Sequence, residues 1–343
     1  MSILFFNILY FFLVCSLLEG AHSSIKTFNG ISGRFSSEKE SNGFYPNNFS
    51  MEYRIQVPSG RRAMLSFKNF SILGSMPNCS EDYVEISLGC QNIRSIGKYC
   101  SCGLITPLPF DFYSIDECMT LTFKSDVKYA AQGFVAEYSS DLKNQPVSNK
   151  DTCTAISNQH NSSVSNIFTP LWPNNYPTKT SCSWNFENPV NYSIIIQFMD
   201  FEIERTVFCD PNEEKDDRVM IKASRKFVSG PFEIVNKRIC SLMNDVDKRK
   251  IFRVIVPDIY RKIAVNFIND ADSHTATGFT AGMISYKSDP PDTQSCRVRL
   301  VPPRPPTPSM SPNMLLSSAN LLLFATFYFA FCFTLKPCTC VFE

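Results

Sequence analysis

One irregular series of landmarks occurs twice in this chain, and it constrains the fold more than any other feature. In each copy two phenylalanines precede a cysteine, an aspartate, a valine and a second cysteine, and a phenylalanine, an aspartate and a Gly-Phe pair follow. The first copy comprises Phe67, Phe70, Cys79, Asp82, Val84, Cys100, Phe123, Asp126, Gly133 and Phe134. The second comprises Phe198, Phe201, Cys209, Asp217, Val219, Cys240, Phe267, Asp270, Gly278 and Phe279. The offset of roughly 130 to 145 residues is too long for a solenoid, so we predict two copies of one domain.

Short segments of each copy alternate between two faces, which is the period of a β-strand. In residues 62–70, Leu65 and Phe67 share one face. The matching face of residues 192–201 carries Ile194, Ile196 and Phe198. No window shows a helical period of comparable strength, and clusters of Pro, Asn, Gly and Ser interrupt the chain about every ten residues. Each copy is therefore predicted to be an all-β sandwich of short antiparallel strands.

Apolar segments near both ends predict secretion followed by membrane anchoring. Residues 1–20 resemble a signal peptide, with cleavage expected after Gly20. Residues 314–335 carry no charge and, as a helix, would span about 30 Å of hydrocarbon. They predict a single transmembrane helix with an extracellular ectodomain and a cytoplasmic tail at residues 336–343. The proline-rich residues 288–313 are predicted to form an extended stalk.

The sequence also leaves an alternative mode of attachment and argues against two classes of function. Small residues before the apolar C-terminal segment leave a lipid anchor, or a secreted protein, as the alternative to a membrane span. The net charge of +1 arises from 33 basic and 32 acidic residues, which gives no basic footprint for a nucleic acid. Three dispersed histidines and the lack of a hydrolase, zinc-protease or P-loop motif predict that the chain is not an enzyme.

The cysteines and glycosylation sequons agree with an extracellular location. Ten cysteines lie between the two apolar segments, and an even number in a secreted chain predicts a disulfide framework. Five N-x-S sequons predict N-glycosylation at Asn48, Asn69, Asn78, Asn161 and Asn191. All five asparagines lie on the side of the predicted membrane span that would be extracellular.

The motifs of the two copies resemble the CUB domain family. The second copy, residues 150–287, carries the segment TPLWPNNYP at 169–177, Cys182-Ser-Trp184 and Asp217-Arg-Val219 before its Gly-Phe pair. The first copy, residues 26–140, is more divergent and has Tyr53 in the tryptophan position. The resemblance implies two tandem CUB-like jelly-roll sandwiches, which cover most of the predicted ectodomain.

The family's disulfides map unequally onto the two copies. The resemblance implies the pairs Cys153–Cys182 and Cys209–Cys240 in the second copy and Cys79–Cys100 in the first. Met51 stands where the first copy's other cysteine would be. We expect two of the additional Cys90, Cys102 and Cys118 to pair locally and the third to reach Cys296 in the stalk, and the sequence leaves that pairing open.

Many CUB domains bind calcium through a glutamate and two aspartates, supported by a tyrosine, and the second copy fills all four positions. The resemblance assigns Glu204, Asp217 and Asp270 as ligands and Tyr176 as their support. Three carboxylates suit a hard cation such as calcium. The inserted run DPNEEKDD at residues 210–217 lengthens the loop before Asp217 and offers Asp216 as a competitor.

The first copy keeps only part of this set. Tyr45, Asp82 and Asp126 match, but Leu73 replaces the glutamate, so we interpret them as a residual or structural site. In family members with the site, a partner's Lys or Arg contacts the calcium-ordered carboxylates. The resemblance therefore implies a surface glycoprotein that binds an extracellular protein, or a glycan, through its second copy. The alternative is a structural or self-associating surface protein, and the sequence does not specify whether the chain forms homo-oligomers.

Overall fold

The structure is a computed structural model that describes residues 24–287, except 90–93, 103–107, 109, 148–165, 207–208, 210–215, 226–233, 244–248 and 271–273. The predicted signal peptide, stalk, transmembrane segment and tail lie outside the described residues. Within the described part, no helix is long and apolar enough to cross a membrane.

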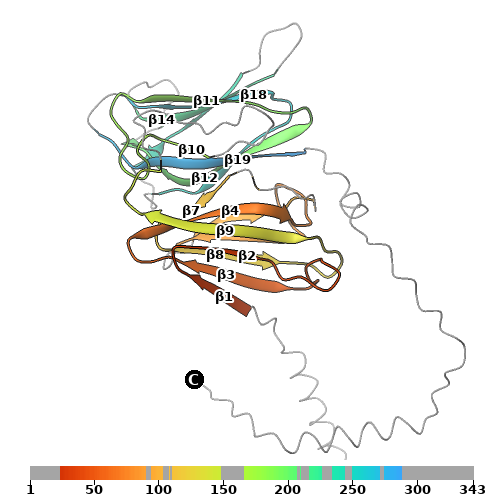
Figure 1. The fold of residues 1–343 in the computed structure, drawn as a ribbon. Coiled ribbons are helices and arrows are strands. Elements are labelled where there is room, and N and C mark those ends of the chain that lie inside the picture. The colour runs from red at the N-terminus through yellow and green to blue at the C-terminus, as the bar shows by residue number, and fades with distance from the viewer. Residues whose placement is uncertain are drawn as a thin grey trace, which may run out of the picture. The chain divides into compact units, whose positions relative to one another are not determined.

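The first repeat folds into two layers of strands (Figure 1). One sheet has the order β1-β3-β8-β5-β6, and the other has the order β2-β9-β4-β7. The strands are β1 (Ser24–Asn29), β2 (Ser32–Ser36), β3 (Ser50–Gln56), β4 (Arg61–Ser71), β5 (Tyr83–Leu88), β6 (Arg94–Tyr99), β7 (Phe112–Tyr113), β8 (Cys118–Lys124) and β9 (Gly133–Leu142). The predicted β-sandwich is therefore present.

The second repeat has the same two-layer design. Its sheets have the orders β11-β18-β14-β15 and β10-β19-β12-β17, and β13 and β16 form a further pair. The strands are β10 (Ile167–Phe168), β11 (Ser181–Glu187), β12 (Tyr192–Glu202), β13 (Arg205–Thr206), β14 (Arg218–Ser224), β15 (Ile234–Ile239), β16 (Ser241–Leu242), β17 (Phe252–Val256), β18 (Lys262–Ile268) and β19 (Gly278–Lys287).

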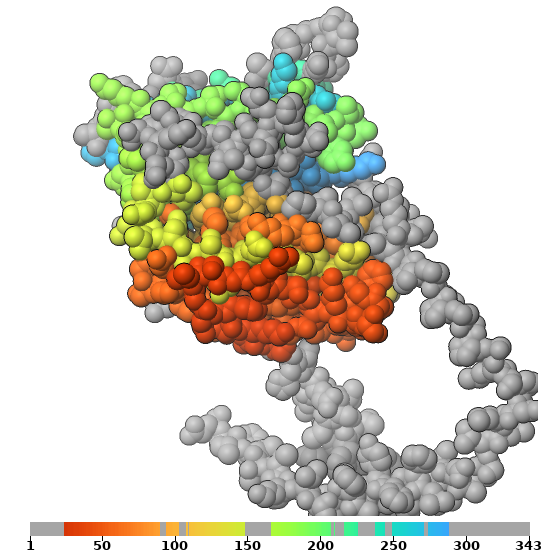
Figure 2. Space-filling view, in the orientation of Figure 1, coloured from red at the N-terminus to blue at the C-terminus, as the bar shows by residue number. Residues whose placement is uncertain are grey.

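The strands pair antiparallel, as predicted, except at two places. Strand β1 pairs with β3 in parallel, and the short pair β13–β16 is also parallel. Strands β1 and β2 flank Gly30 and join different sheets, so no hairpin fixes the direction of β1. Most of β1 is exposed, and Figure 2 shows the red side chains of this N-terminal region on the molecular surface.

The inward faces predicted from alternation form the cores. Leu65 and Phe67 of β4 lie in the apolar cluster of the first repeat. Ile194, Ile196 and Phe198 of β12 lie in that of the second. Strands β4 and β12 each contain a β-bulge. It comes directly after the inward-pointing Phe67 in β4 and directly after Phe198 in β12. The bulge shifts the alternation, so the second phenylalanine of each landmark pair also points inward.

The Gly-Phe landmark combines a backbone requirement with the centre of the core. Gly133 and Gly278 have φ values of +78° and +80°, and a Cβ at Gly278 would lie 1.8 Å from Thr169 Oγ1. Only glycine tolerates both constraints. The next ring, Phe279, contacts Trp184, Phe198, Phe201 and Phe267. The landmark therefore starts the last strand and places one aromatic ring among the others.

Replacement of the central ring tests this description of the core. We expect Phe279→Ala to lower the free energy of unfolding by about 3–5 kcal/mol, because it leaves a cavity among aromatic rings. Urea unfolding measures the change. Val190→Ala, at a position that is 63% exposed, should stay within about 0.5 kcal/mol of the parent protein. Equal effects of the two substitutions would contradict the assignment of Phe279 to the core centre.

Candidate functional site

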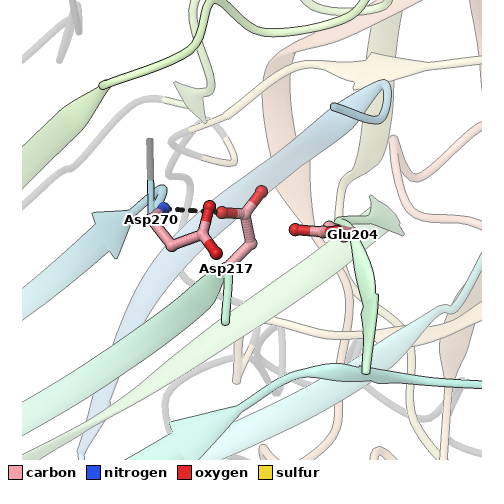
Figure 3. Close-up of side chains that lie close together, drawn as sticks. All are labelled: Glu204, Asp217 and Asp270. Atoms are coloured by element: carbon pink, nitrogen blue, oxygen red, sulfur yellow. Dashed lines mark hydrogen bonds between the residues drawn. The ribbon is translucent and has the colours of Figure 1, made fainter. Parts of the chain in front are cut away.

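Three carboxylates from separate strand ends meet at one end of the second repeat (Figure 3). Glu204 follows β12, Asp217 precedes β14 and Asp270 follows β18. One carboxylate oxygen from each residue lies within 4.8 Å of the others. The fold thus brings together the three residues that the family resemblance assigned as metal ligands.

Asp217 is the central member of the group and is fully buried. The Tyr176 hydroxyl and the Asn269 side-chain amide donate hydrogen bonds to its Oδ2, the latter at 3.1 Å. The backbone N–H of Asp270 donates to Oδ1 at 2.9 Å. Tyr176 also accepts a bond of 2.9 Å from the backbone N–H of Glu204. Tyr176 and Asp217 therefore join the loops that carry the other two carboxylates.

The environment of Asp217 disfavours its charged form. Burial raises the pKa of this carboxyl, its hydrogen bonds oppose the rise, and the nearby Asp270 carboxylate adds to it. These hydrogen bonds come from a phenol, an amide and a backbone N–H, all of which are neutral. A cation at the carboxylate cluster would favour ionised Asp217.

The other two carboxylates are partly open to solvent. The side chain of Glu204 is 23% exposed, and Asp270 is also half-buried. His274 Nδ1 lies 3.6 Å from Glu204 Oε1, and the histidine side chain is 73% exposed. A ligand approaching from solvent can therefore reach the group on the side of Glu204 and Asp270.

Asp216, which the sequence offered as an alternative ligand to Asp217, contacts residues outside the carboxylate group. Its Oδ2 accepts a hydrogen bond of 2.8 Å from Thr206 Oγ1 and lies 3.8 Å from a guanidinium nitrogen of Arg238. The structure thus separates the roles of the two neighbouring aspartates, although residues 210–215 lie outside the described part.

Sequence reasoning missed two contributors to the site. Asn269 donates to Asp217, and its side-chain oxygen accepts a bond of 2.7 Å from the backbone N–H of Lys179. The sequence signal that could have identified Asn269 is its position directly before the predicted ligand Asp270. His274 approaches Glu204 from a loop, and no pattern in the sequence indicated that contact.

The first repeat contains the tyrosine and backbone hydrogen bonds of this network without the third carboxylate. Tyr45 donates to Asp82 Oδ2 at 2.5 Å, and the Asp126 backbone N–H donates to Asp82 Oδ1 at 2.6 Å. The backbone N–H of Leu73 donates to the Tyr45 hydroxyl at 3.1 Å, as that of Glu204 does to Tyr176. Among the described residues, the metal-like group of three acids occurs in the second repeat.

The donor set of the second repeat fits a hard divalent cation. All three side chains offer oxygen, the atom that calcium prefers, and the strand ends place the oxygens close enough to share one ion. In the first repeat Leu73 supplies no oxygen from its side chain. Asp82 and Asp126 remain there in hydrogen bonds that join loops.

Each repeat contains one of the disulfide bonds that the family resemblance implies. Cys79–Cys100 and Cys209–Cys240 form disulfide bonds. Cys102, Cys118 and Cys182 are also disulfide-bonded, whereas the expected partners Cys90, Cys153 and Cys296 lie outside the described residues. The sequon asparagines Asn48, Asn69, Asn78 and Asn191 are exposed, and Asn161 lies outside the described residues.

Comparisons with known proteins agree with the fold. The chain matches the model of the family described as CUB domain over residues 25–138 and 153–229. It is 31% identical over 168 residues to procollagen C-endopeptidase enhancer 2 of Homo sapiens, which covers 49% of this chain and 38% of that protein. It is 27% identical over 265 residues to procollagen C-endopeptidase enhancer 1 of Rattus norvegicus, which covers 77% of this chain and 50% of that protein.

The chain therefore spans half or less of the length of these two relatives. Among solved structures, the CUB1-EGF-CUB2 domains of rat MASP-1 align with a TM-score of 0.28 and 18% identity. That alignment covers 76% of this chain and 99% of the MASP-1 fragment.

The buried aspartate of the first repeat predicts a pH dependence of stability. Burial raises the pKa of Asp82 from 3.8 to about 6, so between these values the native state binds more protons than the unfolded state. Stability in calcium-free buffer should therefore fall as the pH rises from about 4 to about 6. Urea unfolding across this range measures the slope. Asp82→Asn should reduce the slope, whereas an undiminished slope would contradict the prediction; Asp258→Asn is the matched control.

Proposed function

Because the chain belongs to the CUB domain family, we propose that it binds extracellular proteins through its second repeat and that calcium organises the binding surface. The observation that supports this function is the convergence of Glu204, Asp217 and Asp270 at one end of the sandwich. Asp217 is buried among neutral hydrogen-bond donors, and the other two acids face solvent in part. This arrangement suits an ion that Asp217 binds on the buried side and that a partner protein approaches from the solvent side.

Each residue has a distinct part in the proposed site. Glu204, Asp217 and Asp270 would hold calcium through their carboxylate oxygens, and Tyr176 positions Asp217 and the backbone of Glu204. Bound calcium supplies positive charge that holds the three carboxylates together. Glu204 and Asp270 then offer oxygen to a Lys or Arg side chain of the partner, through charge-assisted hydrogen bonds.

We place this function at the cell surface. The disulfide bonds and the exposed sequon asparagines agree with a secreted domain. The proposed anchor is the apolar segment 314–335, with a lipid anchor or release from the membrane as the alternative. The function needs no catalytic group, because binding and presentation of a ligand are sufficient for it.

Calcium titration tests the site directly. We expect calorimetry of the full-length protein to show one calcium ion per chain. Glu204→Gln and Asp217→Asn should each weaken binding at least about tenfold, because each removes a charged ligand. Asp216→Asn changes the adjacent carboxylate and should leave the affinity unchanged. No binding at millimolar calcium, or equal losses in Asp216→Asn and Asp217→Asn, would contradict the assignment.

Partner binding is tested separately. The names of the relatives make procollagen a suitable first probe. We expect surface plasmon resonance to show binding of procollagen in calcium that is lost in EDTA and reduced at least about tenfold by Glu204→Gln. Acetylation of the probe's lysines should have a similar effect, because it removes their charge. Binding that resists both EDTA and Glu204→Gln would contradict this role of the site, and self-association of the chain alone would favour the structural alternative.

A further inference from the structure

Strand β12 of the second repeat and most of the neighbouring β19 are buried on both faces. In a sandwich, one face of an antiparallel sheet packs on the core and the other normally meets water. Strand β12 directs Ile194, Ile196 and Phe198 into the core. Its opposite face carries Ile195, Gln197 and Met199, each 0% exposed. The sandwich of the second repeat does not account for this burial, so another part of the molecule covers the outer face.

Apolar residues of the first repeat cover it. Met199 belongs to the apolar cluster of the first repeat, and Ile251 and Ile284 pack against the same cluster. The Phe110 ring lies directly on β19, where a Cβ at Gly282 would come within 2.4 Å of the ring. Glycine at this position therefore lets an aromatic ring of one repeat contact the backbone of the other.

An arginine from the second repeat forms the polar part of this contact. The Arg253 guanidinium donates a hydrogen bond of 3.1 Å to the Lys98 carbonyl and lies 5.1 Å from the centre of the Tyr99 ring. Its Nε donates to the side-chain oxygen of Gln197. A Cβ at Gly97 would lie 2.2 Å from this guanidinium, so a side chain there would displace the arginine from its present position.

A second group of contacts reinforces the first. Tyr113 of the first repeat packs with Phe168 and Trp172 of the second. The Arg62 guanidinium lies 5.2 Å from the Trp172 ring. The side chain of Asn166 is 3% exposed and pairs with the backbone of Asp111, accepting from its N–H at 2.8 Å and donating to its carbonyl at 2.7 Å.

We propose that the first repeat is an intramolecular partner of the second, docked on the outer face of β12, β17 and β19 so that the two repeats behave as one rigid unit. Separation would expose apolar side chains and remove the backbone partners of the Asn166 amide and the bond between Arg253 and the Lys98 carbonyl, which costs free energy. The proposal extends the function above. In this proposal the first repeat stabilises the second by packing on it. The covered sheet face is then unavailable to ligands of other molecules.

Cleavage of the connection between the repeats tests the proposal. A protease site is inserted within residues 148–152 of the full-length protein in mild detergent, before Cys153, so that the expected Cys153–Cys182 disulfide stays inside the second fragment. The Cys296→Ser background prevents a disulfide to the stalk from holding the fragments together. After cleavage in EDTA we expect the fragments to elute together at micromolar concentration. Separate elution would overturn the proposal, and because calcium is absent this outcome is independent of the proposed calcium site.

Two substitutions probe the contact itself. Arg253→Ala and Gly282→Ala should each weaken the association of the cleaved fragments at least about tenfold. Lys222→Ala, which removes an exposed basic residue from the other sheet of the second repeat, is the matched control and should have no effect. Association unchanged in both Arg253→Ala and Gly282→Ala would overturn the proposal.

Rescue separates a contact effect from misfolding. Phe110→Leu makes room for the added methyl group and should restore at least part of the association lost in Gly282→Ala. Near-ultraviolet circular dichroism of the released second repeat checks that each variant is folded. A folded Gly282→Ala protein whose loss is not relieved by Phe110→Leu would contradict the assigned contact between these two positions.

Discussion

A buried aspartate bonded to a tyrosine and to the backbone of a distant loop is the constraint on which one end of each repeat depends. Asp82 and Asp217 accept from Tyr45 and Tyr176, and each also accepts from the backbone N–H of the later aspartate landmark. A buried carboxylate without such donors would be strongly destabilising. The network therefore fixes three loops relative to one another, and it explains why the tyrosine and the buried aspartate recur in both copies.

Two side chains distinguish the networks of the two repeats. Asn269 donates to Asp217, whereas Ser125, which also precedes the later aspartate, donates to the Pro46 carbonyl; and Glu204 stands where the first repeat has Leu73. The backbone N–H of Leu73 and that of Glu204 donate to the equivalent tyrosines, so the two residues occupy the same place in the fold. The loop geometry does not require a carboxylate there, because leucine satisfies the same backbone bond. The carboxylate of Glu204 is thus not explained by this backbone hydrogen bond, and its oxygen completes a group suited to a cation.

The sequence predicted what depends on local alternation and on the repeated landmarks. The sandwiches and the inward faces of β4 and β12 were predictable because a period of two assigns residues to faces. Parallel β1 was not, because strand direction at a sheet edge depends on a crossover rather than on side-chain pattern. Asp217 was distinguished from Asp216 only by the family resemblance, and the proximity of His274 to Glu204 arises from loop geometry.

The burial of the outer face of β12 was not predicted from the sequence, although the sequence contains a signal for it. The bulged position is Lys68 in the first repeat, which is exposed, and Met199 in the second, which is buried. Together with Ile195, that methionine gives β12 an apolar character on both faces, a pattern more typical of a strand covered on both sides than of a sandwich sheet facing water. The first repeat lacks the third carboxylate but supplies the rings that meet this face. It keeps the network that joins its loops and contributes a packing surface, whereas the second repeat carries the group of three carboxylates.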